Sequence, residues 1–328
     1  MGRVSVLMCV YNTQPEYLAE SMESILCQSF KDFEFIIMND GSTNQKSLDV
    51  MYSYKDSRIK IYDNPSNIGL TKSLNRGLQH CNGKYIARMD ADDISEPDRL
   101  KEQLLYAEHT GASVSGALCE VFPGHQQRYF FTENRAKQMV RMAFGNAGIV
   151  HSTAFLRHDT MACHNIKYNE SYKRAQDYGL WCEYLSKGFP LYCCPKKLVR
   201  WRISDSQISS RYRKEQRMYA RKIRHDFIGK NFVIPRDNLK TFTELIDDTM
   251  YQRRVDVRLA ERVLSAFVSD NRKTIACMED EVYRFWIAQA RMALKRKNTR
   301  WLLSKMGFQS LRHVPYYLWC REHEKIDV

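Results

Sequence analysis

Apolar runs and helix-like segments alternate along the first 120 residues. A continuous apolar run is typical of a strand that is buried on both faces of a parallel sheet. The range 4–10 is such a run, and strands are also predicted at 33–38, 58–62 and 85–89. Between the runs, apolar residues recur at helical spacing, as at Leu18, Met22, Ile25 and Leu26 and again at Leu70, Leu74 and Leu78. This alternation predicts an α/β fold with a doubly wound, mostly parallel sheet joined by right-handed crossovers.

Polar side chains follow three of these expected strands, at the point where each strand ends. Asn12 follows the first strand, Asp40 follows the second, and the tetrad Asp90-Ala91-Asp92-Asp93 follows the fourth. Ligands of open α/β sheets bind at the carboxyl ends of the strands. The sequence contains neither GxGxxG nor GxxxxGK[ST], which disfavours dinucleotide and P-loop sites. The three clusters therefore predict a nucleotide-type pocket at one edge of the sheet.

The tetrad itself suggests a cation. Three carboxylates within four residues repel one another unless a cation or a donor-rich ligand lies between them. Hard cations such as Mg²⁺ or Mn²⁺ bind one or two carboxylates and complete their shell with substrate phosphates. The alternative is a solvated acidic turn that caps a helix starting near Pro97. The pattern thus indicates either a divalent-cation site, with Mg²⁺ or Mn²⁺ as the cofactor, or a structural cap.

Composition narrows the class of protein. The chain has 328 residues, of which 44% are hydrophobic and 27% charged, so it can bury one large core or a core with an appendage. No run of about 18 apolar residues occurs, which argues against a membrane-spanning helix. The first apolar stretch is too short for a signal peptide, and the ten cysteines form no CxxC pair. We therefore expect reduced thiols, no zinc site and a cytoplasmic location.

The positive charge is concentrated in the last third of the chain. Residues 1–210 hold 25 Lys and Arg against 23 Asp and Glu, whereas residues 211–328 hold 26 against 15. The range 211–232 mixes basic with aromatic residues. This mixture fits an amphipathic helix on an anionic membrane surface, a solvated basic helical bundle, or a nucleic-acid-binding segment. The acidic tetrad in the expected pocket argues against nucleic acid.

Six sequence blocks resemble one enzyme family. They are VSVLMCVYN, SILCQSFKDFEFIIMNDGS, NIGLTKSLNRGL, GKYIARMDADD with the following SEPDRL, NESYKRAQDYGLW and VRWRISDSQIS, in order over about residues 3–210. Together they are similar to family 2 inverting glycosyltransferases, which are nucleotide-sugar enzymes of the A-type fold and abundant in bacterial capsule, O-antigen and exopolysaccharide assembly. The resemblance implies a glycosyltransferase domain at 1–210, with a donor half at about 1–120 and an acceptor half at about 121–210, before a basic helical region at 211–328.

Carried over by position, the resemblance implies roles for residues of the donor half. Asp40 would accept a hydrogen bond from the uracil imide, although the residue alone also fits a turn cap. Lys72 would neutralise phosphate, although it also fits a solvated helix lysine. The residues that the resemblance places at the nucleotide sugar are Asn12, Asp40, Asn67, Lys72, Asn75, Asp90 and Asp92, and those nearest the metal and diphosphate are Asp92 and Asp93.

In the acceptor half, the resemblance makes Asp177 the general base that removes the proton from the acceptor hydroxyl. Taken alone, Asp177 also fits a carboxylate that stabilises a helix N-terminus. His151 and Arg202 match positions that would meet acceptor or phosphate. Ser204 stands where the family usually has a His that would help bind metal or diphosphate. Arg99 matches a position where we expect helix packing.

These expectations combine into one function. We expect transfer of a sugar from a UDP-sugar to a glycan or lipid-linked acceptor, with inversion, in cell-surface polysaccharide synthesis. The protein would be cytoplasmic and peripheral at the inner face of the membrane. One alternative, raised by Ser204, is a catalytically weak member that binds nucleotide sugar. The other is a nucleic-acid-binding α/β protein.

Overall fold

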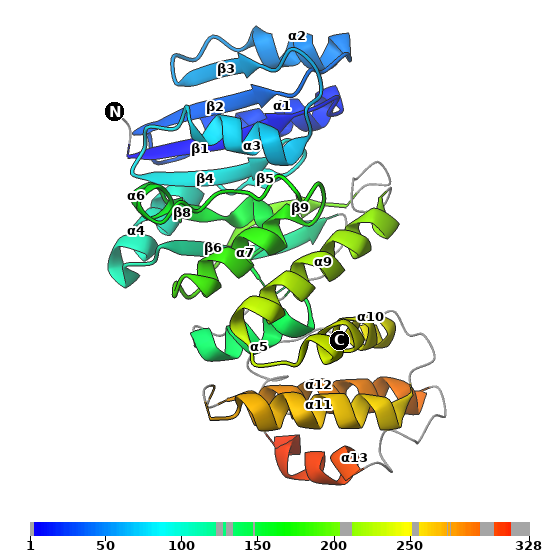
Figure 1. Cartoon of the computed structure of the whole chain (residues 1–328). Coiled ribbons are helices and arrows are strands. Elements are labelled where there is room, and N and C mark those ends of the chain that lie inside the picture. The colour runs from blue at the N-terminus through cyan, green and yellow to red at the C-terminus, as the bar shows by residue number, and fades with distance from the viewer. Residues whose placement is uncertain are drawn as a thin grey trace. The chain divides into compact units, whose positions relative to one another are not determined.

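The computed structural model describes residues 3–122, 127–128, 134–146, 148–203, 212–250, 256–273, 275, 277–295 and 305–315 (Figure 1). The chain forms two compact units. One comprises Met1–Glu133 and Gly148–Gln216, and the other comprises Asn134–Ala147 and Arg217–Val328. The segment Asn134–Ala147 thus belongs to the C-terminal unit, whereas the division expected from the sequence places it in the acceptor half.

The first unit alternates strands and helices through the donor half and then continues with strands of unequal length, from two to eleven residues (Figure 1). Its elements in chain order are β1 (Val4–Val10), α1 (Pro15–Leu26), β2 (Phe33–Asn39), α2 (Gln45–Ser53), β3 (Ile59–Asp63), α3 (Leu70–Leu78), β4 (Tyr85–Asp90), β5 (Ile94–Ser95), α4 (Arg99–Thr110), β6 (Val114–Phe122), β7 (Gln127–Arg128), η1 (His151–Thr153), β8 (Phe155–Arg157), α6 (His158–Cys163), α7 (Gln176–Ser186) and β9 (Tyr192–Arg202).

The strands of the described residues form one sheet in the order β3-β2-β1-β4-β8-β6-β9-β5, with β7 paired to β6. The donor half is parallel, since β1 pairs with β2 and β4, and β2 pairs with β3, all in parallel. Beyond β4 the pairs β4–β8, β6–β8, β5–β9 and β6–β7 are antiparallel, and β6–β9 is parallel. The expectation of a mostly parallel sheet is therefore wrong outside the donor half. The sheet is mixed because β8 runs antiparallel to both neighbours, β4 and β6.

The register of the parallel strands brings the polar ends together. Val10 of β1 pairs with Asn39 of β2, and Cys9 pairs with Asp90 of β4. The residues that follow these positions therefore leave the sheet at the same edge. This edge carries the loops that contain Asn12, Asp40 and the acidic tetrad.

Helices cover both faces of the donor half. Alternate residues of β1 face one apolar cluster that includes residues of α1 and α4, namely Val4, Val6, Met8, Val10, Leu18, Met22, Ile25, Leu100 and Leu104. On the other face, Gly77 of α3 lies so close to the sheet that an added Cβ would meet Leu7 at 2.5 Å and Met38 at 2.8 Å. In Figure 1, α3 is drawn in front of the strands. The donor half is thus wound on both sides, as its pattern predicts.

The second unit is helical in its described residues. Its helices are α5 (Arg135–Phe144), the part of α9 (Arg213–Asn231) from Arg217 onward, α10 (Arg236–Met250), α11 (Val257–Asn271), α12 (Met278–Lys295) and α13 (Lys305–Ser310). Phe242 lies between Phe144 and Phe267, with ring centroids at 5.8 and 4.6 Å, and Arg141 forms a buried two-point ion pair with Glu281, 2.9 Å at each contact. None of the helices in the described ranges combines the length and apolar composition that crossing a membrane requires.

Candidate active site

Asn12 fixes the loop that follows β1. Its backbone is left-handed, with φ at 50°, a conformation that asparagine adopts more readily than most residues. Its Oδ1 accepts hydrogen bonds from the backbone N–H groups of Thr43 at 2.8 Å and Asn44 at 2.9 Å. Asn12 therefore joins the loops after β1 and β2. The adjacent Tyr11 is 51% exposed, so its ring offers a surface on which a base can stack.

Asp40 is held by its own chain. It is 3% exposed, and its carboxylate accepts hydrogen bonds from the side-chain amides of Asn64 at 2.8 Å and Asn67 at 3.1 Å. It also accepts from the backbone N–H groups of Ile68 at 2.9 Å and Gly69 at 3.0 Å. A carboxylate has about four lone-pair sites, and these donors fill them. The expected contact of Asp40 with uracil stays a prediction, and it requires one of the four donors to yield.

A buried arginine that the sequence analysis did not single out lies beside the acidic tetrad. Arg88 belongs to β4, its side chain is 3% exposed, and its guanidinium forms a two-point ion pair with Asp90. Bidentate pairs of this kind are stronger than single charged contacts. Arg88 therefore offsets one negative charge of the tetrad and fixes the orientation of Asp90. Its signal in the sequence is a charged residue inside an otherwise apolar strand.

The other two carboxyls of the tetrad, Asp92 and Asp93, have raised pKa values. Burial, and after it the charge of Asp90, raises the pKa of Asp92 to about 6. Burial, Asp90 and Asp92 together raise the pKa of Asp93 well above its usual value. Asp93 is 0% exposed. The Ser152 hydroxyl and the Arg202 backbone lower its pKa in part, and no described residue donates to its Oδ2 with hydrogen-bond geometry. The positive groups and hydrogen-bond donors of the chain therefore offset only part of the negative charge of the tetrad.

Arg202, at the end of β9, donates two hydrogen bonds to the tetrad. Its backbone N–H donates to Asp93 Oδ1 at 2.9 Å, and its Nε donates to the carbonyl of Asp92 at 2.7 Å. Its guanidinium lies 4.1 Å from the ring centroid of Tyr17 and 4.6 Å from that of Phe122. Arg202 thus supports the loop of the carboxylates, and its expected contact with acceptor or phosphate stays a prediction. Ser204 lies outside the described residues.

The donor set suits a cation that shares its ligands with a substrate. Across the described part of the chain, no group of three or more His, Cys, Asp or Glu is arranged to hold a metal ion. A Mg²⁺ or Mn²⁺ ion that takes most of its ligands from phosphates and water needs fewer protein groups. The unpartnered Oδ2 of Asp93 and the raised pKa of Asp92 fit such an ion, because added positive charge stabilises both carboxylates. Asp90 is the poorer ligand because both its oxygens pair with Arg88.

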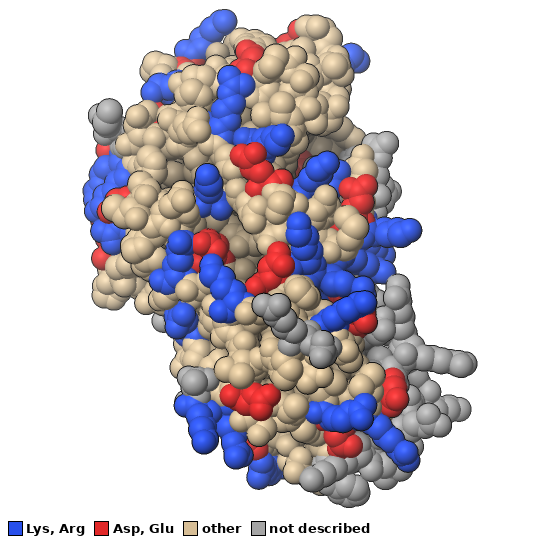
Figure 2. Space-filling view, in the orientation of Figure 1, with Lys and Arg blue, Asp and Glu red and all other residues tan. Residues whose placement is uncertain are grey.

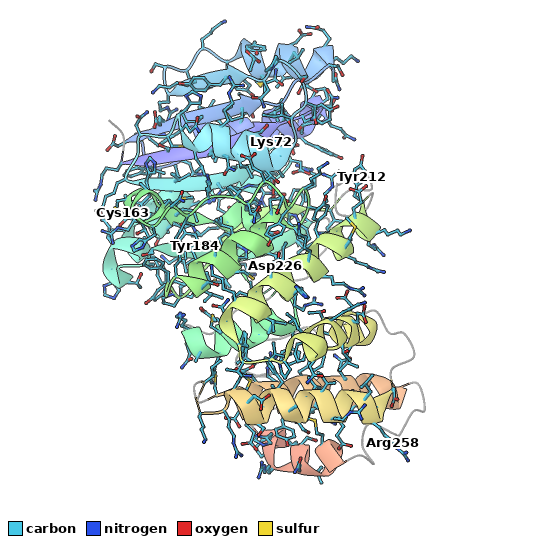
Figure 3. The ribbon with its side chains drawn as sticks, in the orientation of Figure 1. Lys72, Cys163, Tyr184, Tyr212, Asp226 and Arg258 are labelled. Carbon is cyan, nitrogen blue, oxygen red and sulfur yellow. The ribbon has the colours of Figure 1, made fainter. Side chains whose placement is uncertain are left out.

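Two residues of α3, Lys72 and Asn75, were both expected at the nucleotide, but their surroundings differ. Lys72 is exposed on α3 (Figure 3), and in the described part of the chain it forms no hydrogen bond or ion pair. Asn75 instead bonds to the acceptor half: its Nδ2 donates to the Tyr168 carbonyl at 2.8 Å and to Glu170 Oε1 at 3.1 Å, and its Oδ1 accepts from the Tyr168 N–H at 3.0 Å. The Asn75 side chain is therefore bonded to the acceptor half in this structure, and its expected position beside the nucleotide stays a prediction.

Asp177 lies in the first turn of α7. Burial, and the charges of Asp177 and Asp90 after it, raise the pKa of Tyr168 against the opposing charge of Arg88. The charges of Asp177 and Asp90 thus both contribute to the raised pKa of the buried Tyr168. Ala175, just before α7, has a left-handed backbone with φ at 55°, a conformation that alanine adopts only at an energetic cost.

His151 is partly buried, and its side chain contacts Tyr168. Its Nε2 lies 2.8 Å from the Tyr168 hydroxyl, and its ring centroid lies 6.3 Å from that of Trp181. Burial, with the charge of Arg88 after it, lowers the pKa of His151 well below its usual value. The imidazole is therefore neutral at neutral pH. A neutral ring offers a phosphate no ionic attraction, so of its two expected contacts an acceptor hydroxyl is the more compatible.

Arg99 packs α4 against the sheet. It is 0% exposed, its Nε donates to Gln103 Oε1 at 2.9 Å, and one terminal nitrogen donates to the carbonyl of Arg88 at 2.7 Å. Burial, and the charge of Arg88 after it, lowers the pKa of Arg99 to about 9. These contacts are those of a helix-packing residue, the role that we expected for this position.

Comparisons with known proteins agree with this geometry. Glycosyl transferase family 2 matches residues 5–165. An uncharacterized glycosyltransferase of Haemophilus influenzae is 33% identical over 238 residues, which cover 69% of this chain and 73% of that protein. The amylovoran biosynthesis glycosyltransferase AmsE of Erwinia amylovora is 29% identical over 214 residues, 63% of this chain and 79% of AmsE.

The fold is also found in a solved structure. Residues 1–349 of S. aureus TarS, in complex with UDP-GlcNAc, superpose with a TM-score of 0.58 at 17% identity, over 90% of this chain and 92% of that one. The family match covers the loops with Asn12, Asp40 and the tetrad, whereas Asp177 and Arg202 lie beyond it. With the identity to the Haemophilus protein and the mixed α/β sheet, these findings lead to one conclusion. The chain belongs to glycosyl transferase family 2 and is a glycosyltransferase.

Proposed function

We propose that this chain transfers a sugar from a UDP-sugar to a glycan or lipid-linked glycan acceptor, with inversion, in cell-surface polysaccharide synthesis. The observation that carries the proposal is the tetrad at the carboxyl edge of the sheet, where burial and mutual repulsion raise the pKa values of Asp92 and Asp93. A ligand that brings a divalent cation relieves this repulsion. A metal-bound nucleoside diphosphate is such a ligand.

Two comparisons support the donor and the pathway. The TarS structure of similar fold holds UDP-GlcNAc, and the AmsE relative is named for amylovoran biosynthesis. In this chain the exposed Tyr11 ring at the end of β1 offers a stacking surface for uracil. Asp40 lies buried in the next loop of the same edge. Lys72, exposed on α3, offers a positive charge to phosphate.

Asp92, with the spare oxygen of Asp93, would hold Mg²⁺ or Mn²⁺ together with oxygens of the donor. When bound, the cation stabilises the negative charge that develops on the leaving diphosphate. The protein's part is to keep the carboxylates in place. Arg88 holds Asp90 from β4, and Arg202 holds the backbone of Asp92 and the Oδ1 of Asp93 from β9.

Asp177 is the proposed general base. An acceptor hydroxyl attacks the anomeric carbon from the face opposite the diphosphate, the new C–O bond forms as the sugar–phosphate bond breaks, and UDP leaves with the bonding electron pair. Asp177 takes the proton of the attacking hydroxyl. The charge that accumulates on the sugar resembles that of an oxocarbenium ion, as in glycoside cleavage. A single displacement of this kind inverts the anomeric configuration.

Release of UDP tests the proposal. The full chain is incubated with a panel of UDP-sugars and Mn²⁺, and released UDP is measured against GDP-mannose as the control donor. We expect release from one member of the panel, with water as a slow acceptor, and loss of release when a chelator removes the cation. Equal release of nucleotide from every donor would indicate a nonspecific contaminant.

We also propose that α9 lies against an anionic membrane surface, where the acceptor lipid would reside. Arg213, Lys214, Lys222 and Lys230 are exposed on α9, and Met218 among them is 58% exposed. Exposed cations with an apolar side chain between them suit an anionic interface. On the face drawn in Figure 2, Lys and Arg alternate with Asp and Glu, unlike the single-sign stripe typical of nucleic-acid binding.

Binding to vesicles checks this surface. We expect the full chain to bind vesicles that contain phosphatidylglycerol, and we expect added salt to weaken the binding because it screens exposed charges. Lys214→Glu with Lys222→Glu should weaken it further, at about 1 kcal/mol for each basic residue near the surface. The matched pair Lys46→Glu with Lys101→Glu, on α2 and α4 of the donor half, should bind as wild type. Equal loss in both pairs would contradict a specific role for α9.

A further inference from the structure

Side-chain hydrogen bonds tie α3 to the segment 168–172, which precedes α7. Thr71 Oγ1 donates to the carbonyl of Tyr172 at 2.9 Å. Asn75 bonds to both backbone groups of Tyr168, at 2.8 and 3.0 Å, and to the Glu170 carboxylate at 3.1 Å. Thr71 is 4% exposed, so the hydroxyl has no water to replace its partner. Two polar residues of a donor-half helix thus hold the backbone of an acceptor-half segment.

The N-terminal end of α3, near Thr71, is also attached to the loop of Asp40. Asp40 accepts hydrogen bonds from the N–H groups of Ile68 and Gly69, which immediately precede the helix. Asn64, a further partner of Asp40, also donates to Ser73 Oγ in the middle of α3 at 2.7 Å. One short helix therefore connects the loop of Asp40 with the segment 168–172.

The segment 168–172 leads directly into the candidate base. Ala175 follows it with a left-handed backbone, and strained residues of this kind persist only where the surrounding structure determines them. Arg174 lies between this segment and Ala175. Its guanidinium carbon lies 4.1 Å from the centroid of the Tyr212 ring (Tyr212 is labelled in Figure 3). The chain just before Ala175 is thus held at two places, at residues 168–172 by α3 and at Arg174 by Tyr212.

We infer that Thr71 and Asn75 are positioning residues for Asp177, so that α3 sets the candidate base relative to the bound donor. The inference rests on the proposed function, because it assumes that Asp177 removes the acceptor proton. The two residues touch neither donor nor acceptor in this account. They act by fixing the backbone of residues 168–172, and through it the turn at Ala175 from which α7 presents Asp177. Small displacements of a catalytic group lower the rate of the chemical step more than the affinity for substrate.

Isosteric substitutions separate this role from general packing. Thr71→Val keeps the shape of the side chain and removes the donor to Tyr172, whereas Thr71→Ser keeps the donor. We expect Thr71→Val to lower the maximal rate of UDP release about tenfold, with the KM for the donor changed by less than about twofold, and Thr71→Ser to restore most of the rate. The matched control is Thr243→Val in α10, which removes a buried hydroxyl that donates to backbone carbonyls.

A second readout needs no turnover. Hydrogen exchange of the amides in residues 168–181 should be faster in Thr71→Val than in wild type, Thr71→Ser and Thr243→Val. If the wild-type chain releases UDP from no donor, the proposed function fails. The exchange rates still decide whether the hydrogen bonds of α3 hold residues 168–172. Unchanged exchange in Thr71→Val overturns the inference, as does a loss of rate that Thr243→Val reproduces or a loss of donor affinity as large as the loss of rate.

Discussion

Asp177→Asn is expected to slow sugar transfer by about 10²–10⁴-fold, the usual contribution of general base catalysis. Asparagine keeps the size and hydrogen-bonding reach of the side chain but accepts no proton at neutral pH. Because Asp177 touches the acceptor and not the nucleotide in this account, the affinity for UDP with Mn²⁺ should stay near that of wild type. The rate of transfer to a sugar acceptor and calorimetric UDP binding, measured on the same preparation, check both parts.

A matched variant distinguishes chemistry from helix stability. Asp159 occupies the first turn of α6 as Asp177 occupies the first turn of α7, and a carboxylate there stabilises a helix by about 0.3–1 kcal/mol. Asp159→Asn should therefore lose a similar amount of stability and keep full transfer. If Asp177→Asn also keeps nearly full transfer, Asp177 is a helix-start residue and the base lies elsewhere.

Asp92→Asn is expected to remove the divalent-dependent part of UDP binding. Loss of an outer partner of a metal ligand lowers metal affinity by roughly 10–100-fold, so loss of a ligand itself should exceed that. We therefore expect UDP with Mn²⁺ to raise the melting temperature of wild type and to leave that of Asp92→Asn unchanged. The control is Asp98→Asn, an exposed carboxylate near the start of α4. A Mn²⁺-dependent shift of wild-type size in Asp92→Asn would remove Asp92 from the metal site.

The same variant should be more stable than wild type when no metal is present. Folding raises the pKa of Asp92 from 3.8 to about 6, so the folded chain holds this proton more tightly than the unfolded chain. The stability that the proton contributes is fully present below pH 3.8 and is lost as the pH rises through about 6. At neutral pH the charged side chain therefore destabilises the metal-free fold. Asp92→Asn removes this charge, and thermal melts at pH 7 without metal should show a higher melting temperature.

The donor half was predictable because its strands are buried on both faces. The apolar runs that became β1, β2 and β4 need partners on either side, and such runs stand out in a sequence. The later strands do not stand out. β9 contains Pro195 and two lysines, and β8 has only three residues. Neither strand therefore shows a recognisable pattern of apolar residues. Their positions depend on pairing with distant strands, which an amino-acid pattern along the chain does not encode.

The sequence predicted which types of residue lie at the candidate site. It did not predict the hydrogen-bond partners of these residues. The sequence showed that Asp40 and the tetrad end neighbouring strands, and the parallel register does bring them to one edge. It did not show that four donors of the chain already bond Asp40, or that Asn75 is bonded to Tyr168. Arg88 is visible in the sequence as a single charge in an apolar strand, but the sequence does not show that its partner is Asp90. Such pairings are set by tertiary contacts, where side chains far apart in sequence satisfy each other's hydrogen bonds.

The central claim is that this edge of the sheet binds a UDP-sugar with a divalent cation and releases UDP. Measuring UDP release by the wild-type chain across a panel of UDP-sugars, with and without Mn²⁺, tests it most directly. We expect release from one UDP-sugar that depends on the cation and disappears in Asp92→Asn. Release from GDP-mannose with none from any UDP-sugar, or release that persists unchanged in Asp92→Asn, would contradict it.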